Sequence, residues 1–423
     1  MPTTFNAGEL DLEFASQGRF SHPEYNHLGP IAILESTQKT LISSAPRNAT
    51  AIKLLRLEAD GTLDLGFGSQ GVATIEYGGA LGVFLSEIIT DEAGRIFVVG
   101  DYNYAPDSYH PIVVRLLANG EPDIDFGEDG KPYRIYRSVS STLKERPINL
   151  ASTTKNSRSS AQDNDSAGIW NGVLYFRSRD HIVAITLKGD LATDFNGTGY
   201  WRAAHKGQPV LLGAMALDEQ GIYAAHAPMP TEDFQNHVVV TRLDMRAKVD
   251  ETFAAHGHLR LSTPGHTLLP ARLKQSTSNH HFVLACRTDI NTLDEGTALM
   301  SFNSDGTLNA DFNEGRPVII QKNPSVMASA SDLSFDARSG DAEKIYLTVL
   351  YENEESGGLF VTLRFNSDGN LDRDYGVDGW AFVGKSGMAS WISCQRNGQA
   401  LVACNLKLPT DTRTGLYLAR LGA

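Results

Sequence analysis

Four charged residues interrupt apolar, β-rich runs of this sequence and are the first candidates for chemistry: Glu87, Arg272, Lys274 and Asp332. Carboxylates and amines held close together can act as a general acid and a general base. The spacing of these residues along the chain defines no distance between them, so the sequence identifies no acid–base pair. We interpret Glu87, Arg272 and Asp332 as candidates for the lining of a central channel.

A second set of candidates lies in polar stretches between apolar runs. Its members are tyrosines, histidines and an acid that could contact sugars, peptides or cations: Tyr102, Tyr104, Tyr109, His110, His226 and Glu232. Variable loops on a rigid scaffold are where binding residues concentrate. We therefore predict that these side chains form a ligand-binding surface on loops.

Familiar catalytic and metal motifs are missing. The chain contains no G-x-S-x-G, no glycine-rich phosphate loop, no H-E-x-x-H and no C-x-x-C. The segment DIDFGEDG at 123–130 offers carboxylates that could hold Ca²⁺, but it lacks the EF-hand spacing and its acids follow from the repeat described next. We predict no cofactor and no metal site.

A repeat that runs along the whole chain must position these candidates. The segment DGTLDLGFGSQG at 60–71 combines an Asp-Gly turn, an aromatic residue and a second turn. Its aromatic position recurs in seven copies: Phe14, Phe67, Phe126, Phe195, Phe253, Phe312 and Tyr375. The intervals run from 53 residues (14 to 67) to 69 residues (126 to 195), and the last copy reaches the first across the chain ends in 62. A period that closes into a ring is typical of a β-propeller.

An arginine precedes the motif aspartate by eight residues in most copies. The pairs are Arg56 and Asp64, Arg115 and Asp123, Arg242 and Asp250, and Arg364 and Asp372. Two copies lack both partners and have Ala184 with Ala192 and Ser301 with Asn309. Joint retention and joint loss favour contact, because a lone survivor would be an uncompensated charge. We predict charge-assisted pairs that hold each turn on its strand.

The pattern R-x-x-x-D-G-x-L-D-x-x-F-G-x-x-G at 56–71, with the hairpin DEAGRIFVVG at 91–100, resembles the delta-60 repeat family of bacterial β-propellers. The resemblance covers essentially the whole chain and is strongest at 60–71, 119–130 and 368–379. It implies the propeller fold and no particular activity. Members of that family are often exported, whereas the first residues here lack the basic and apolar segments of a signal peptide.

We predict an all-β, seven-bladed β-propeller of four-stranded antiparallel blades, forming a single domain over residues 1–423. The start of the chain supplies only an outer strand, and its end supplies three strands. The closing blade is therefore expected to combine 1–21 with 384–423, and Arg420 is the expected partner of Asp11. The Ser/Thr/Asn-rich stretch 138–167 is predicted to be an irregular loop insertion.

Composition narrows the class of partner. The formal net charge of −13 argues against a nucleic-acid-binding face and against adsorption to anionic membranes. No apolar run is long enough to insert into a membrane. Three cysteines are too few for a disulfide framework, and their odd number cannot be fully paired, so we expect them to be free thiols buried in the hydrophobic core. The expected location is the cytoplasm, or outside the cell by export without a cleaved signal peptide.

The leading interpretation is a non-enzymatic, monomeric binding scaffold that presents a variable loop face to a protein or carbohydrate partner. The alternative is a hydrolase or lyase with a polar active site at the mouth of the propeller channel. A lectin with one site per blade is disfavoured, because the loops differ in length and content.

Overall fold

The computed structural model describes most of the chain, and the statements below concern that part. The described residues are 6–22, 25, 28–45, 50–78, 82–105, 108–127, 130–136, 167–205, 208–227, 237–276, 278, 280–290, 295–320, 327–336, 343–353, 357–385, 387–407 and 414–423. Glu232 and nearly all of the predicted insertion 138–167 lie outside them.

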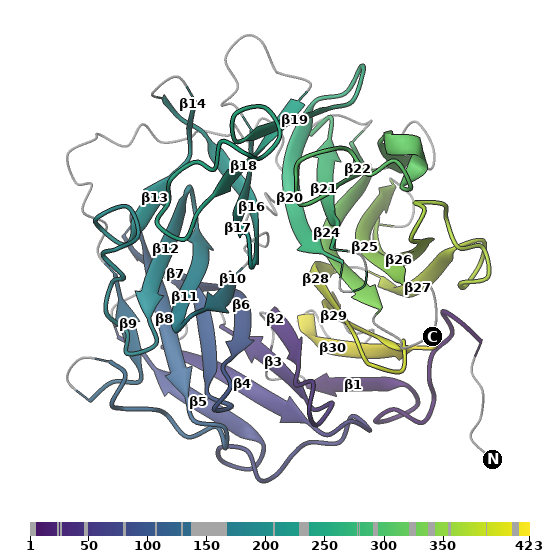
Figure 1. Cartoon of the computed structure of the whole chain (residues 1–423). Coiled ribbons are helices and arrows are strands. Elements are labelled where there is room, and N and C mark those ends of the chain that lie inside the picture. Colours follow the sequence, from purple (N-terminus) through teal and green to yellow (C-terminus); the bar gives the residue numbers. More distant parts are fainter. Residues whose placement is uncertain are drawn as a thin grey trace.

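Seven four-stranded antiparallel sheets form a ring, which confirms the predicted seven-bladed β-propeller (Figure 1). From the centre outward, blade 1 contains β2 (Leu28–Ile33), β3 (Thr40–Ser44), β4 (Ala51–Leu57) and β5 (Val72–Glu76). Blade 2 contains β6 (Gly82–Thr90), β7 (Ile96–Ala105), β8 (Ser108–Leu116) and β9 (Tyr133–Ile135). Blade 3 contains β10 (Ala167–Trp170), β11 (Val173–Ser178), β12 (His181–Thr186) and β13 (Tyr200–Arg202).

The remaining four blades follow the same order. Blade 4 contains β16 (Leu211–Asp218), β17 (Gly221–Ala227), β18 (His237–Leu243) and β19 (His258–Ser262). Blade 5 contains β20 (Leu268–Gln275), β21 (Phe282–Thr288), β22 (Gly296–Phe302) and β23 (Val318–Ile320). Blade 6 contains β24 (Met327–Asp336), β25 (Lys344–Asn353), β26 (Gly357–Asn366) and β27 (Trp380–Lys385). Blade 7 contains β28 (Gly387–Cys394), β29 (Ala400–Lys407), β30 (Thr414–Leu421) and β1 (Arg19–His22).

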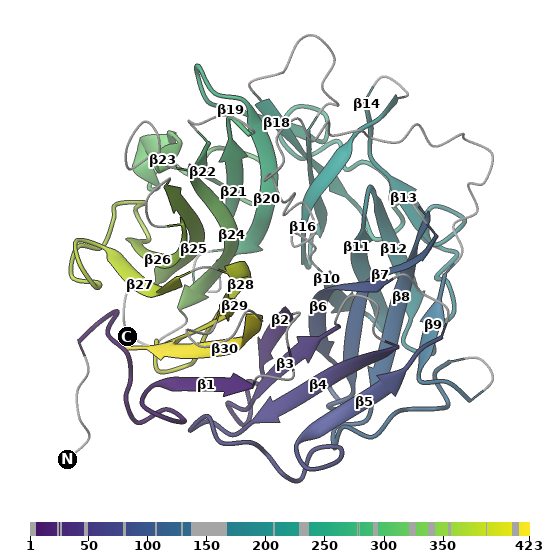
Figure 2. The same ribbon diagram turned by 180° about the vertical axis from the view of Figure 1, so that it is seen from behind.

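Blade 7 joins the two ends of the chain. Its outer strand β1 pairs with β30 in antiparallel register, with Arg19 opposite Ala419 and His22 opposite Leu416 (Figure 2). A short ribbon, β14 (Ala204–His205) with β15 (Gln208–Pro209), and the 3-10 turn η1 (Asn313–Gly315) complete the elements. In the described chain, no helix is both long and apolar enough to cross a membrane.

The hydrophobic core is divided among the blade interfaces. Each of seven clusters of buried apolar residues in the described chain joins two neighbouring blades, as where Leu54 of blade 1 packs in one cluster with Val98 of blade 2. Both faces of most sheets are therefore buried, which explains why the strand sequences alternate poorly between apolar and polar residues.

The repeated motif links neighbouring blades at six of the seven junctions of the described structure. The backbone N–H just after the motif aromatic residue donates to a carbonyl in the following motif turn in six copies: Ala15 to Asp60, Gly68 to Asn119, Asn196 to Arg246, Ala254 to Asp305, Asn313 to Asp368 and Gly376 to Ala7. Glycine suits the receiving turn of blade 2, since Gly120 has φ +86° and a Cβ there would lie 2.5 Å from a ring carbon of Phe67; blade 4 has Ala247 at this position, with φ +67°. These six links form a belt around most of the ring.

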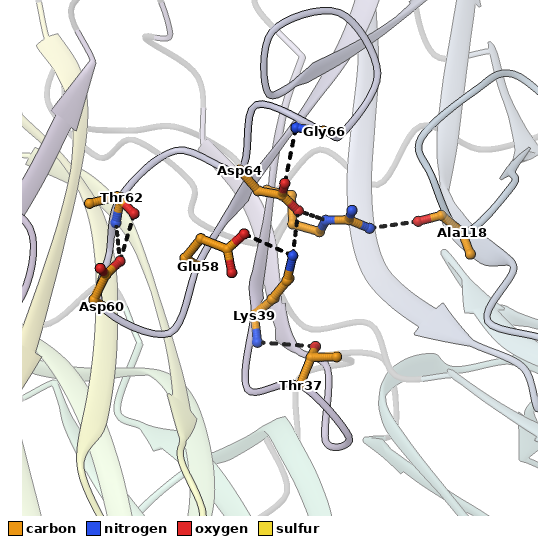
Figure 3. Close-up of polar contacts among 9 residues, drawn as sticks. Thr37, Lys39, Glu58, Asp60, Thr62, Asp64, Gly66 and Ala118 are labelled. Atoms are coloured by element: carbon orange, nitrogen blue, oxygen red, sulfur yellow. Dashed lines mark hydrogen bonds and ion pairs between the residues drawn. The ribbon is translucent and has the colours of Figure 1, made fainter.

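The motif arginines bind their aspartates and also reach the next blade. In four pairs the arginine Nε contacts the aspartate Oδ2, at 2.6 Å for Arg56–Asp64, 2.7 Å for Arg115–Asp123, 2.8 Å for Arg364–Asp372 and 2.6 Å for Arg420–Asp11. In the fifth pair, Arg242 Nη2 lies 2.8 Å from Asp250 Oδ2. The other end of each guanidinium donates to a carbonyl of the following blade in four copies: Arg56 to Ala118, Arg115 to Leu187, Arg242 to Ser304 and Arg420 to Ala59. Figure 3 shows Asp64 contacted by Lys39 and by the Gly66 N–H as well.

The copies without these charges replace the ion pair by weaker contacts. In blade 5, Asn309 Nδ2 donates to Ser301 Oγ at 3.1 Å, and both residues are buried. In blade 3, Ala192 and Ala184 keep only the backbone hydrogen bond between N and O at 2.9 Å. A neutral pair can therefore occupy the position of the charged one in the same fold.

Candidate functional site

The predicted tyrosine and histidine candidates of blade 2 lie in paired strands, where the sequence analysis had placed a loop. Strands β7 and β8 continue to a short hairpin, with Tyr102 opposite His110 and Asn103 opposite Tyr109. Tyr102 is buried between blades, and its hydroxyl donates to the Gly78 carbonyl at 2.5 Å. Burial raises the pKa of Tyr102. The loop placement was wrong because backbone pairing extends through polar residues, and Tyr102 contributes to packing.

An aromatic–arginine patch, defined as Phe84, Tyr104, Tyr109 and Arg179, lies at the end of blades 2 and 3 opposite the motif turns. The guanidinium carbon of Arg179 lies 3.7 Å from the ring centroid of Tyr109, and Phe84 packs 6.0 Å from the same ring. Tyr104, at the tip of the same hairpin, is 63% exposed. Arginine over an aromatic face gains cation–π attraction. The patch joins two exposed side chains to two half-buried rings.

Buried neighbours hold Arg179 in position. Its backbone has φ +55° in the turn between β11 and β12, a left-handed conformation that non-glycine residues rarely adopt. The guanidinium of Arg177 donates to the Arg179 carbonyl at 2.8 Å and to the Leu212 carbonyl of blade 4 at 2.7 Å. The next residue, Ser178, donates to Asp101 Oδ1 of blade 2 at 2.5 Å. The turn is thus tied to both adjacent blades.

The charged groups under this turn are strongly affected by burial. Loss of hydration lowers the pKa of Arg177 to about 9, although the Asp101 carboxylate opposes the change. Burial likewise raises the pKa of Asp101, against the hydrogen bond from Ser178. The sequence analysis missed Arg177 and Arg179 as functional residues. They stand about 70 positions from the tyrosines, and only the sheet register brings them together.

The His226 candidate is also a strand residue. It lies on β17, is buried, and its Nε2 is 3.0 Å from Thr241 Oγ1. The same hydroxyl is 2.9 Å from His258 Nδ1, so two imidazoles flank one threonine across blade 4. This row runs from the buried His226 to the exposed His258 across blade 4 and does not extend the aromatic–arginine patch.

The channel candidates are brought to one level of the ring. We call Glu87, Arg272, Lys274 and Asp332 the axial cluster; they lie on the innermost strands β6, β20 and β24. A β-bulge directly precedes Glu87, Arg272 and Asp332 in their strands. Bulges redirect side chains and are common beside functional sites. The sequence contains no signal for them.

Arg272 and Asp332 form the buried part of the axial cluster. Arg272 Nε lies 2.9 Å from Asp332 Oδ1, and its guanidinium carbon lies 4.6 Å from the ring centroid of Trp391. Asp332 accepts further hydrogen bonds from the backbone N–H groups of Leu333 and Ile392 at 2.8 and 2.9 Å. The ion pair therefore joins blades 5 and 6 at the centre, and blade 7 contacts the same pair through the Ile392 N–H and the Trp391 ring.

Glu87 and Lys274 form the less deeply buried part of the axial cluster. Both side chains are partly exposed, and no ion pair of the described structure joins either to a group of opposite charge. Burial raises the pKa of Glu87 to about 7, even though Lys274 and Arg272 favour its charged form, and the Asp332 charge adds to the rise. A carboxyl with such a pKa can donate or accept a proton near neutral pH.

The part of the chain that the structure describes contains no group of three histidines, cysteines or acids that could hold a metal ion. Asp123 of the predicted calcium-like segment already binds Arg115 through Oδ2 and accepts from the Asp125 N–H through Oδ1. The three cysteines form no disulfide, and two of them, Cys286 and Cys404, are buried.

A family model for a β-propeller matches part of the chain. The family described as "Domain of unknown function (DUF5122) beta-propeller" matches residues 43–67 and 94–126. Curated protein sequences include no significant match. Similar solved structures include a glucose dehydrogenase, which is 11% identical; the match covers 94% of this chain and 97% of that chain, with a TM-score of 0.42. Another is the AfRom2 CNH domain, which is 9% identical; the match covers 95% of this chain and 96% of that chain, with a TM-score of 0.43. A protein of unknown function from Dyadobacter fermentans also matches (11% identity, 81% and 94%, TM-score 0.41). Scores this low transfer no activity to this chain.

Proposed function

We propose that this protein is a non-enzymatic binding scaffold that presents the loop-bearing face of its propeller to a protein or glycan partner. The observation that carries the proposal is the aromatic–arginine patch, in which Arg179 is stacked on Tyr109, while Tyr104 is exposed at the tip of the Tyr109 hairpin. Tyrosine and arginine dominate the energetics of protein interfaces, because each combines a large contact area with hydrogen-bonding groups.

The patch is suited to recognition because it is preorganised. Arg179 is fixed by its stacking contact and by the hydrogen bond from Arg177 to its carbonyl. A side chain that is already ordered loses little conformational entropy when a partner binds. The strand arginines that pair with the motif aspartates offer no comparable site, because a guanidinium such as that of Arg115 is occupied by its aspartate and by a carbonyl of the next blade.

The proposal is tested with arrays of neutral and uronic-acid oligosaccharides and of synthetic peptides, probed with the whole chain. Arg179→Ala and Tyr104→Ala should each weaken the observed binding at least about tenfold, which corresponds to about 1.4 kcal/mol. The matched control is Arg373→Ala, which removes an exposed arginine from a motif turn and should leave binding unchanged. Absence of any bound probe, or equal loss in the control, contradicts the proposal.

A second candidate function is a hydrolase or lyase that uses the axial cluster. It is favoured by Glu87, whose pKa of about 7 suits proton transfer, together with Lys274 on the facing strands of the ring. The test is turnover of chromogenic esters and glycosides, and release of unsaturated products from polyuronides. Activity that is lost in Glu87→Gln and retained in Arg179→Ala would favour catalysis over the scaffold.

A further inference from the structure

At one position of the motif, three consecutive blades have a large aliphatic residue and the other four blades do not. The residue after the motif aspartate, or after Ala192 and Asn309 that replace it, is exposed in every blade. In three copies it is a large aliphatic side chain: Leu12 at 58% exposure, Leu65 at 62% and Ile124 at 59%. The other four copies have Thr193, Glu251, Ala310 and Arg373, all exposed. We call the three aliphatic residues the apolar arc.

The three residues occupy equivalent places in consecutive blades. Each lies inside a turn closed by a hydrogen bond from the aromatic N–H to the aspartate carbonyl, at 3.0 Å for Phe14, 3.0 Å for Phe67 and 3.1 Å for Phe126. Blades 7, 1 and 2 are neighbours, and their turns are linked directly through Ala15 to Asp60 and through Gly68 to Asn119. The aliphatic side chains therefore follow one another along one side of the ring.

The fold itself does not require aliphatic residues at this position. Thr193 and Glu251 occupy it in blades where the same turn forms, with the aromatic N–H to carbonyl distance at 2.9 Å for Phe195 and 3.1 Å for Phe253. Leu65 and its two equivalents keep more than half of their surface in water, so they contribute little to any internal cluster. Exposed apolar side chains that the fold does not require, in consecutive linked turns, are candidates for contact with a partner.

The charges around the arc define its partner. The turns 8–18, 60–71 and 119–127 contain acids and no lysine or arginine, and five of these acids are exposed: Glu9, Glu13, Asp60, Glu121 and Asp125. The corresponding turns of the other four blades each contain at least one basic residue, including Lys188, Arg246, Arg316 and Arg373. Opposite charges across an interface steer association, whereas like charges oppose it. A second copy of this chain would bring acids against acids.

We propose that the apolar arc docks a basic segment of a partner protein, with apolar side chains of that segment covering Leu12, Leu65 and Ile124 and its lysines or arginines meeting the surrounding acids. The site is separate from the aromatic–arginine patch, which lies at the other end of the blades. The two surfaces would allow one propeller to hold two partners at once.

The experiment measures binding of a fluorescent peptide of alternating leucine and lysine to the whole chain by fluorescence polarisation. The triple variant Leu12→Ser, Leu65→Ser, Ile124→Ser should weaken binding at least about tenfold. The matched control Val249→Ser, Leu308→Ser removes exposed aliphatic residues from the motif turns of blades 4 and 5 and should leave affinity within about twofold. Thr193→Leu, which extends the arc into blade 3, should strengthen binding.

Three results would overturn the proposal. The first is equal binding by the triple variant and the native chain. The second is equal affinity for a peptide of alternating leucine and glutamate, because the acids around the arc would then not select a basic partner. The third is self-association of the native chain, measured by light scattering, that the triple variant abolishes, because the arc would then serve a second copy of the chain.

Discussion

Breaking the Arg115–Asp123 pair should destabilise the whole ring. Both side chains are less than 10% exposed, and their Nε–Oδ2 distance is 2.7 Å. Arg115→Ala leaves a buried carboxylate without its cation, removes the hydrogen bond to the Leu187 carbonyl of blade 3, and removes the guanidinium that lies 4.7 Å from the Phe126 ring centroid. We expect a loss of about 4 kcal/mol in the free energy of unfolding.

The double variant Arg115→Ser, Asp123→Asn separates charge pairing from the other contacts. It copies the Ser301–Asn309 pair that blade 5 already contains at 3.1 Å. We expect it to cost at least about 1 kcal/mol less than the two single changes added together, because neither charge is left alone. The assay is urea unfolding followed by tryptophan fluorescence and by circular dichroism, with coincident transitions required.

The control is Arg316→Ala, which breaks an ion pair with Glu314 whose two side chains are mostly exposed. Such pairs contribute about 0–1 kcal/mol, so the midpoint should hardly move. Single-variant costs at Arg115 and Asp123 that add without coupling would refute the reasoning, since the eight-residue correlation in the sequence would then reflect no energetic link between the two side chains.

Three further predictions follow from other contacts. Deletion of residues 1–21 removes all of β1 except His22, the Asp11 partner of Arg420 and the Gly376 link to Ala7, so the thermal midpoint should fall sharply; an unchanged midpoint would contradict the role of these contacts in closure. Gly120→Ala should cost several kcal/mol, because a Cβ would lie 2.5 Å from Phe67, whereas Gly172→Ala at φ +75° has open space and should cost only about 1 kcal/mol of backbone strain. Glu87 binds its proton more tightly in the folded state, where its pKa is about 7, than in the unfolded chain, where the ordinary value is 4.5. Protonated Glu87 therefore adds at most about 3 kcal/mol to the free energy of unfolding at pH 5, and this contribution is lost as the pH rises to 7.5. Urea unfolding at both values should show this loss in the native chain and not in Glu87→Gln.

The architecture was predictable because its determinants are local and repeated. Asp-Gly turns, a buried aromatic residue and a period that closes on itself are visible in the sequence, and the arginine–aspartate spacing follows from one strand and its turn. The second guanidinium contact was not predicted. Its acceptors are backbone carbonyls such as those of Ala118 and Leu187, which belong to the next blade and can be of any residue type.

The candidate site was predicted only in part. The residues Tyr104 and Tyr109 do lie in the aromatic–arginine patch, but the partner that organises it, Arg179, comes from another blade. The axial cluster contains the predicted Glu87, Arg272 and Asp332. Their proximity depends on β-bulges, which cannot be predicted from the residue types at these positions. Contacts between distant segments depend on register, and register depends on how the ring closes.

The belt of motif links has a consequence for biosynthesis. Asp11 emerges early from the ribosome, while its partner Arg420 is added 409 residues later. At typical elongation rates of about 5–20 residues per second, the first segment waits for about 20–80 seconds before its strand partner exists. During that interval the exposed Leu12 and the future strand β1 have no sheet to join, although each completed blade can already dock on its predecessor. A chaperone that holds the nascent amino terminus would therefore be expected to raise the yield of closed rings, and translation speed would be a determinant of how much of this protein reaches its folded state.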